Sequence, residues 1–337
     1  MRGQVLVTGG SGYIGGFVIR QLAAAGWTVN TTIRNLTREP EVRNTLAVPA
    51  AQLRFFAADL TRDDGWAEAM AGCTHVVHVA SPLPLGAVKH EDDLIVPARD
   101  GALRAVTFAA QAGVQRVVLT SSVAAIAYGH EGRTTYSEAD WTDLNGRHVN
   151  AYAKSKTLAE RAARDWVAAH GGGMELCSVN PSAVFGPVLS DDFSGSIELV
   201  RRLIAGALPG LPNFGFGIVD VRDVAELHVR LLTAAGVDRE RFIASGPFLM
   251  MHEIARILRE RLGAEGRKVP TRRLPDFVLR AFGLFDPEVR FVVGELGQTR
   301  ATPATHAFEV LGWEPRDAAA TLEDTARSLI DMGIVKL

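Results

Sequence analysis

The chain has 337 residues, a length typical of two domains or of one large domain. Hydrophobic residues make up 47% of it and charged residues 22%, which excludes disordered, collagenous and fibrous proteins. The 36 basic residues nearly balance the 38 acidic ones, giving a formal charge of −2. Such a balance provides no general field that would capture nucleic acid or an anionic membrane, so neither is an expected partner.

The first half of the chain alternates short β-branched runs with helix-length amphipathic stretches. Strands are predicted at 4–8, 28–34, 53–57, 74–80, 116–121 and 175–179, and helices at 12–25, 66–71, 94–112 and 151–169. This alternation indicates βαβ units that build a parallel sheet with helices on both faces. The predicted fold class is α/β, with a Rossmann-type doubly wound parallel sheet.

The pattern changes after Pro181, where prolines and glycines surround one predicted helix at 196–207. A strand-helix unit follows at 217–233, then a strand at 242–244 and a mostly helical tail at 252–337. We expect residues 1–182 and 216–246 to form the cofactor domain. Residues 183–215 and 247–337 are expected to form a smaller, mostly helical substrate-binding domain.

The cysteines and the N-terminus indicate the compartment. Cys73 and Cys177 both lie inside apolar runs, which predicts reduced, buried thiols rather than disulfides or metal ligands. The N-terminal segment breaks into glycines almost at once, and no apolar run reaches the roughly 18 residues of a membrane span. We therefore expect a soluble, cytoplasmic protein without a bound metal.

A glycine-rich turn, TGGSGYIGG, follows the first predicted strand and places Gly9, Gly12 and Gly15 before a helix. A strand, a tight turn and a helix N-terminus present backbone N–H groups and a positive dipole end to a pyrophosphate. An ordinary strand-to-helix turn is the alternative. The position in the first unit of the chain favours a dinucleotide site.

The end of the second predicted strand suggests which dinucleotide binds. Arg34 stands at its tip and no carboxylate precedes Glu39, whereas a protein that prefers NAD would offer an acid to the ribose 2′-hydroxyl. A guanidinium suits a 2′-phosphate, so we predict NADP(H). A solvated loop cation is the alternative for Arg34. Asp59, after the third strand, is predicted either to bind the adenine amino group or to cap the next helix.

Tyr152 and Lys156 stand four residues apart in YAKSK, so one turn of helix places them on the same face. A phenol with a pKa near 10 exchanges protons poorly at neutral pH, and a nearby ammonium lowers that pKa. The pair predicts a general acid/base. Ser121 and Ser122 end a strand at the ligand-binding edge of the sheet, where a hydroxyl can orient a carbonyl group. Which serine acts is left open.

These motifs, in this order, resemble the extended short-chain dehydrogenase/reductase superfamily. The segments HVASP, YAKSKTLAERAARDW, NPSAVFGP and VDVRDVAELHV resemble more narrowly its dihydroflavonol reductase and cinnamoyl-CoA reductase branch, which includes NADPH-dependent aldehyde and ketone reductases. The resemblance implies catalytic roles for Ser122, Tyr152 and Lys156. It further implies that the cofactor is lined by Gly9, Gly12, Tyr13, Ile14, Arg34, Asp59, Leu60, Ala80, Ser81, Thr120, Tyr152, Lys156, Pro181 and Val184.

The substrate side is expected at 82–88, 125–128, 185–196 and 211–216, segments with few charged groups that suit a small to medium, largely apolar carbonyl compound. Plant dihydroflavonol reductases carry a polar amide where this chain has Ala127, which argues against a flavonoid. Alternatives are a 3β-hydroxysteroid dehydrogenase, a sugar-nucleotide epimerase or dehydratase, and a dinucleotide-sensing regulatory protein. We expect a monomer or homodimer acting on a carbonyl or alcohol substrate.

Overall fold

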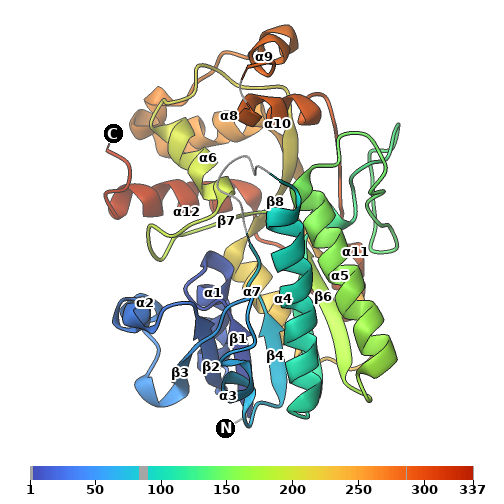
Figure 1. Ribbon diagram of the computed structural model, residues 1–337. Coiled ribbons are helices and arrows are strands. Elements are labelled where there is room, and N and C mark those ends of the chain that lie inside the picture. Colours follow the sequence, from blue (N-terminus) through green and yellow to red (C-terminus); the bar gives the residue numbers. More distant parts are fainter. Residues whose placement is uncertain (1–2, 83–89, 286, 337) are drawn as a thin grey trace.

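The computed structural model describes residues 3–82, 90–285 and 287–336 of the chain (Figure 1). Its centre is a seven-stranded sheet in the order β3-β2-β1-β4-β5-β6-β9, in which every neighbouring pair is parallel. The strands are β1 (Gln4–Thr8), β2 (Thr28–Ile33), β3 (Leu53–Ala57), β4 (His75–His78), β5 (Arg116–Thr120), β6 (Glu175–Pro181) and β9 (Arg241–Ala244). This order is the doubly wound arrangement that the sequence predicts.

Helices cover both faces of this sheet because alternate strand residues point to opposite sides. Val5 and Val7 pack with α1 (Tyr13–Ala24) and α7 (Val221–Leu231), whereas Leu6 packs with the other helix layer. That second layer consists of α3 (Trp66–Met70), α4 (Asp92–Gln111) and α5 (Ala151–His170). Parallel strands buried on both sides read as continuous apolar runs, which is why the sequence pattern identified them.

Most of the remaining elements form a second lobe beyond the carboxyl ends of the strands (Figure 1). A three-stranded sheet, β10-β8-β7, packs there with α6 (Gly195–Ile204), α8 (Met251–Leu262) and α12 (Ala318–Asp331) around a separate apolar core. Its strands are β7 (Ala183–Phe185), β8 (Gly215–Asp220) and β10 (Phe248–Met250). The other helices are α2 (Glu39–Leu46), α9 (Asp276–Phe282), α10 (Pro287–Glu295) and α11 (Thr305–Leu311). Nothing in the described chain is both long and apolar enough to be a membrane-spanning helix.

The predicted fold class is confirmed. Two segments, however, pack in a different domain from the one to which the sequence assigned them. Strand β8 was assigned to the cofactor domain, yet it pairs with β7 and β10 in the small sheet. Helix α11 was assigned to the substrate domain, yet Ala307 and Trp313 belong to the core under the large sheet, and Trp313 Nε1 donates to Asp223 O. The α11 segment packs where it can bury Ala307 and Trp313. Local sequence periodicity does not reveal which core these side chains join.

Candidate active site

The glycine turn between β1 and α1 leaves room for a ligand. Gly9 adopts a φ of 74°, a conformation that favours glycine, and a Cβ at Gly15 would overlap the carbonyl oxygen of Gly9. Helix α1 begins after Gly12, and no side chain caps its first turn. The helix N-terminus therefore offers uncapped backbone N–H groups and the positive end of the dipole to an anion.

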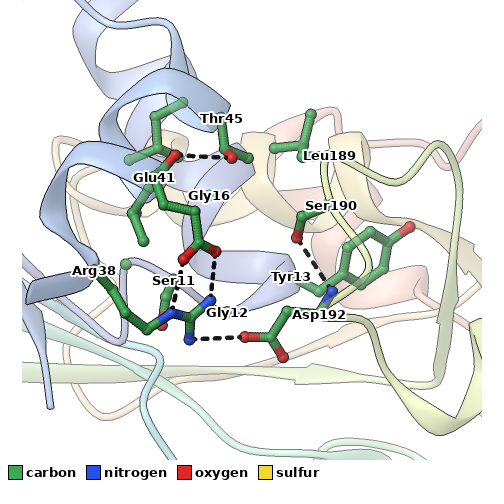
Figure 2. A pocket seen from close by; sticks show the side chains of 13 residues that line it. Ser11, Gly12, Tyr13, Gly16, Arg38, Glu41, Thr45, Leu189, Ser190 and Asp192 are labelled. Atoms are coloured by element: carbon green, nitrogen blue, oxygen red, sulfur yellow. Dashed lines mark hydrogen bonds and ion pairs between the residues drawn. The ribbon is translucent and has the colours of Figure 1, made fainter. Parts of the chain in front are cut away.

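Figure 2 shows a recess beside this turn, with an empty volume of about 380 Å³. The Arg38 guanidinium bonds Glu41 at 2.7 Å and lies 3.5 Å from Asp192, a residue of the second lobe. These contacts, the bond to Glu41 foremost, raise the pKa of Arg38. Tyr13 lines the recess, and its hydroxyl donates to Gly186 O at 2.9 Å. Backbone and side chains of both lobes thus meet at the mouth of the glycine turn.

Arg34 and Asp59 meet at the edge of the large sheet, directly after β2 and β3. Arg34 is exposed, and no ion pair to it appears among the residues that the structure describes. Asp59 accepts hydrogen bonds from the N–H and the hydroxyl of Thr61, and these bonds lower its pKa, with a smaller contribution from the charge of Arg34. The carboxylate of Asp59 is thus bonded within its own turn, and the guanidinium of Arg34 stays free for a ligand.

A second recess, of about 260 Å³ empty volume, lies at the carboxyl ends of β4 and β5. It brings together four of the predicted cofactor residues, Ala80, Ser81, Thr120 and Lys156. The other predicted positions lie on neighbouring segments: Leu60 follows β3, Pro181 ends β6, and Val184 is a buried residue of β7. The predicted set therefore follows one edge of the sheet from the glycine turn to α5.

The two candidate serines point in different directions. Ser121 Oγ donates to Glu160 Oε2 at 2.5 Å, inside the protein. Ser122 Oγ accepts from the Ala124 N–H at 3.1 Å, lies 3.4 Å from Pro181 O, and interacts with the hydroxyl of Tyr152, which lowers the pKa of that phenol. The geometry favours Ser122 as the serine that faces the tyrosine.

Tyr152 and Lys156 lie on one face of α5, with Lys156 Nζ 5.9 Å from the centre of the Tyr152 ring. Burial raises the pKa of Tyr152 above its ordinary value of 10, although the hydrogen bond from Ser122 opposes this. Burial also lowers the pKa of Lys156 to about 8, with the charge of Glu160 opposing the shift. The net direction of the tyrosine pKa is therefore opposite to the lowering expected from the lysine: burial raises it, and the hydrogen bond from Ser122 is the effect that opposes burial.

Glu160 lies one further helical turn along α5 and is fully buried. It accepts hydrogen bonds from Ser121 and from Asn180 Nδ2, and it pairs with Arg164 at 3.0 Å and Arg241 at 2.7 Å. Asn180 also donates to the backbone carbonyl of Ser122. The sequence analysis did not select Glu160, although its spacing from Lys156 in YAKSKTLAE was a visible signal.

Parts of the expected substrate side are instead core. Ile126 and Ala127 are buried against Tyr136 and Ile243, and Phe185 is buried in the core of the second lobe. The expectation for these residues is wrong: Ile126 and Ala127 follow the 3₁₀ turn Val123–Ala125 into one apolar core, and Phe185 ends β7 in another. Residues 83–88 of the expected set lie outside the described residues. Tyr128 belongs to the expected substrate segment 125–128, and near Tyr152 it contacts Arg300, which pairs with Glu295; the sequence analysis did not select these two charged residues.

Cys73 and Cys177 are buried thiols, as predicted, and His78 is buried beside β1. His78 Nδ1 hydrogen-bonds Thr8 Oγ1 at 2.9 Å, and burial lowers its pKa to about 3. Both cysteines are free and buried. Among the described residues, no three histidine, cysteine or acidic side chains are grouped so that they could hold a metal ion.

Comparison with known proteins identifies the family. Residues 5–244 match the model of the NAD dependent epimerase/dehydratase family. The chain belongs to this family. It is 32% identical over 272 residues to a dihydroflavonol 4-reductase of Zea mays, covering 77% of this chain and 74% of that protein. It is 34% identical over 270 residues to cinnamoyl-CoA reductase CAD2 of Medicago truncatula, covering 76% and 80%. The resemblance seen in the sequence motifs is confirmed.

The fold also matches solved structures of reductases. The yeast methylglyoxal/isovaleraldehyde reductase Gre2, complexed with NADPH, superposes with a TM-score of 0.83 at 24% identity, covering 98% of this chain and all of that one. Vestitone reductase from alfalfa gives a TM-score of 0.76 at 24% identity, covering 99% of this chain and 100% of that chain. These structures share the arrangement of the large sheet and the second lobe.

Proposed function

We propose that this protein, an NADP-dependent oxidoreductase of its family, reduces an aldehyde or ketone of modest size to the alcohol. The observation that carries the proposal is the convergence of Ser122, Tyr152 and Lys156, the last of which lines the second recess. The names of the relatives support it, since they are reductases, and Gre2 is an aldehyde reductase complexed with NADPH.

The described residues fit such a cofactor. The uncapped first turn of α1 and the approach made possible by Gly12 and Gly15 suit a pyrophosphate. Arg34 would bind the 2′-phosphate, because its guanidinium is exposed and Asp59 is held within its own turn. Lys156 would bind the nicotinamide ribose from the second recess. The reduced nicotinamide, when bound, supplies a hydride.

The protein's own groups would bind and protonate the carbonyl oxygen. Ser122 and Tyr152 donate hydrogen bonds to it, which orients the carbonyl and stabilises the negative charge that develops on oxygen. Tyr152 then gives up its proton to that oxygen, completing the alcohol. Because burial raises the pKa of the phenol, Tyr152 is held protonated before the reaction and is ready to act as the acid. The ammonium of Lys156 stabilises the phenolate that remains.

The test is a panel of aldehydes, ketones, β-ketoesters and steroids, each assayed by loss of NADPH absorbance and, in parallel, with NADH. We expect turnover of at least one carbonyl class and a lower KM for NADPH than for NADH. Binding of NADPH without turnover of any compound would instead support a dinucleotide sensor.

The preference for NADPH should depend on Arg34. Replacing Arg34 with leucine removes charge-assisted hydrogen bonds to a 2′-phosphate, so kcat/KM for NADPH should fall by roughly 10- to 100-fold, while that for NADH changes little. Arg54→Leu, a change at another exposed arginine, on β3, is the control and should leave both values unaltered. Equal losses with both cofactors would contradict the role of Arg34.

NADPH binding should weaken at alkaline pH. The pKa of Lys156 is about 8, lowered from 10.5, so the ammonium is present below that pH and is lost as the pH rises through it. We expect the Kd for NADPH, measured by protein fluorescence, to increase above about pH 8. Lys156→Met should bind NADPH weakly at every pH and lack this increase. An increase that persists in Lys156→Met would assign it to another group.

A further inference from the structure

Three side chains that are distant in the sequence form a polar group beside Tyr152, here called the Tyr128 cluster: Tyr128, Glu295 and Arg300. The Arg300 guanidinium carbon lies 4.2 Å from the centre of the Tyr128 ring, and the guanidinium forms an ion pair with the Glu295 carboxylate. The two charged side chains are only 14% and 13% exposed. A pair this enclosed is costly to bury and differs from the loose ion pairs of a protein surface.

The cluster lies where the second lobe meets the catalytic residues. Tyr128 follows Ser122 through the 3₁₀ turn, and its backbone is fixed by bonds with Thr142 Oγ1 and the Asp143 N–H. Glu295 ends α10, and the preceding Gly294 approaches His148, two residues before the cap of the helix that carries Tyr152. Tyr152 is near enough that the negative charge it carries when ionised would raise the pKa of Tyr128.

The hydroxyl of Tyr128 is available to a ligand. It makes no hydrogen bond within the part of the chain that the structure describes. Among the described residues, Asn30 Oδ1 is the one side-chain polar atom that is both fully buried and without a hydrogen-bond partner. Because the Tyr128 hydroxyl also has no partner, it is not fully buried and keeps some contact with solvent. Burial of the residue raises its pKa above the ordinary value of 10, so the phenol is neutral and can donate. An unpaired donor on a partly buried side chain is suited to a bound acceptor.

The charge of the cluster indicates what kind of acceptor would bind. Glu295 neutralises Arg300, so an anionic group would gain little net attraction and would lose its hydration. A neutral oxygen can accept from the phenol, and from a guanidinium N–H, without that cost. We propose that the Tyr128 cluster is a polar subsite that binds a second, neutral oxygen function of the substrate, such as the ester of a β-ketoester.

This inference rests on the proposed function and narrows the substrate class, because the sequence had suggested a largely apolar pocket. The test compares two substrates of similar size, ethyl acetoacetate and 2-hexanone, which both carry a methyl ketone but differ in the ester. We expect the wild type to have a higher kcat/KM for the ketoester. Tyr128→Phe should lower kcat/KM for the ketoester about 10-fold and leave that for 2-hexanone nearly unchanged.

Tyr136→Phe is the matched control: the Tyr136 backbone bonds Ala301, next to Arg300, but its hydroxyl donates to Arg133 O and to no member of the cluster, so the ratio of the two values should be preserved. The double variant Glu295→Leu/Arg300→Leu, which leaves neither charge unpaired, should also reduce the ratio. Equal effects of Tyr128→Phe on both substrates, or none, would overturn the subsite while leaving the reductase function standing. If the wild type reduced neither of these two ketones and no compound of the panel, the proposed function would be overturned, and the subsite with it.

Discussion

Replacing Tyr152 with phenylalanine should remove nearly all carbonyl reduction and leave NADPH binding nearly intact. The substitution removes the hydroxyl beside Ser122 and Lys156, while the aromatic ring near Lys156 Nζ is kept. Loss of a positioned general acid typically lowers the rate by about 10²- to 10⁴-fold, so kcat should fall by that factor. Steady-state NADPH consumption measures the first effect, and fluorescence titration with NADPH measures the second.

Tyr136→Phe again provides the control, because it removes a hydroxyl that donates to the carbonyl oxygen of Arg133 and to none of the catalytic residues. Its kcat should match that of the wild type. If Tyr152→Phe retained wild-type turnover, another group would have to supply the proton, and the assignment of Tyr152 as the acid would be wrong.

The local parts of the site could be predicted because their geometry is set by neighbouring residues. A strand, three glycines and a helix fix the turn that holds Gly12 at the N-terminus of α1. Spacing of four residues on a helix is sufficient to bring Tyr152 and Lys156 to one face. The doubly wound sheet followed from the same kind of information, as short apolar runs alternate with amphipathic stretches.

The parts that escaped prediction depend on contacts between distant segments. Arg38 pairs with Asp192 across the mouth of the glycine turn, and Arg300 stacks on Tyr128, and no periodicity links these residues. Helix α2 was also missed: its segment is polar, with two buried side chains, Val42 and Leu46, that dock on the large sheet's core.

Burial is the physical quantity that sequence analysis judged least well. Ala127 was taken to face the substrate and is 1% exposed, which places it in the core. Burial was also left out of the pKa values predicted for the tyrosine and lysine pair. An ammonium four residues from a phenol lowers its pKa when both are in water, but here burial raises the pKa of Tyr152 and lowers that of Lys156.

The buried carboxylate of Glu160 should be essential for stability. Its partner Arg241 has a side chain 7% exposed, and Arg164 one 16% exposed, so Glu160→Gln would leave two guanidinium groups without a countercharge in the interior. Removing one member of a buried ion pair typically costs about 3–5 kcal/mol, a large share of the roughly 5–15 kcal/mol that stabilises a domain. Urea unfolding should show a loss of that size. Glu260→Gln, which breaks an exposed i,i+4 pair with Arg256, is the control and should cost under about 1 kcal/mol.

The same carboxylate makes the stability depend on acid. The charges of Arg241 and Arg164 and hydrogen bonds lower the pKa of Glu160 from 4.5 to about 2, against the opposing effect of burial. A lowered pKa means that the ionised form stabilises the fold; this contribution is complete above about pH 4.5 and is lost as the pH falls toward 2. In the wild type the free energy of unfolding should therefore decline steeply over this range. Glu160→Gln has no such group to protonate, so its curve should be shallower there, and parallel curves for the two proteins would show that Glu160 is not the carboxylate responsible.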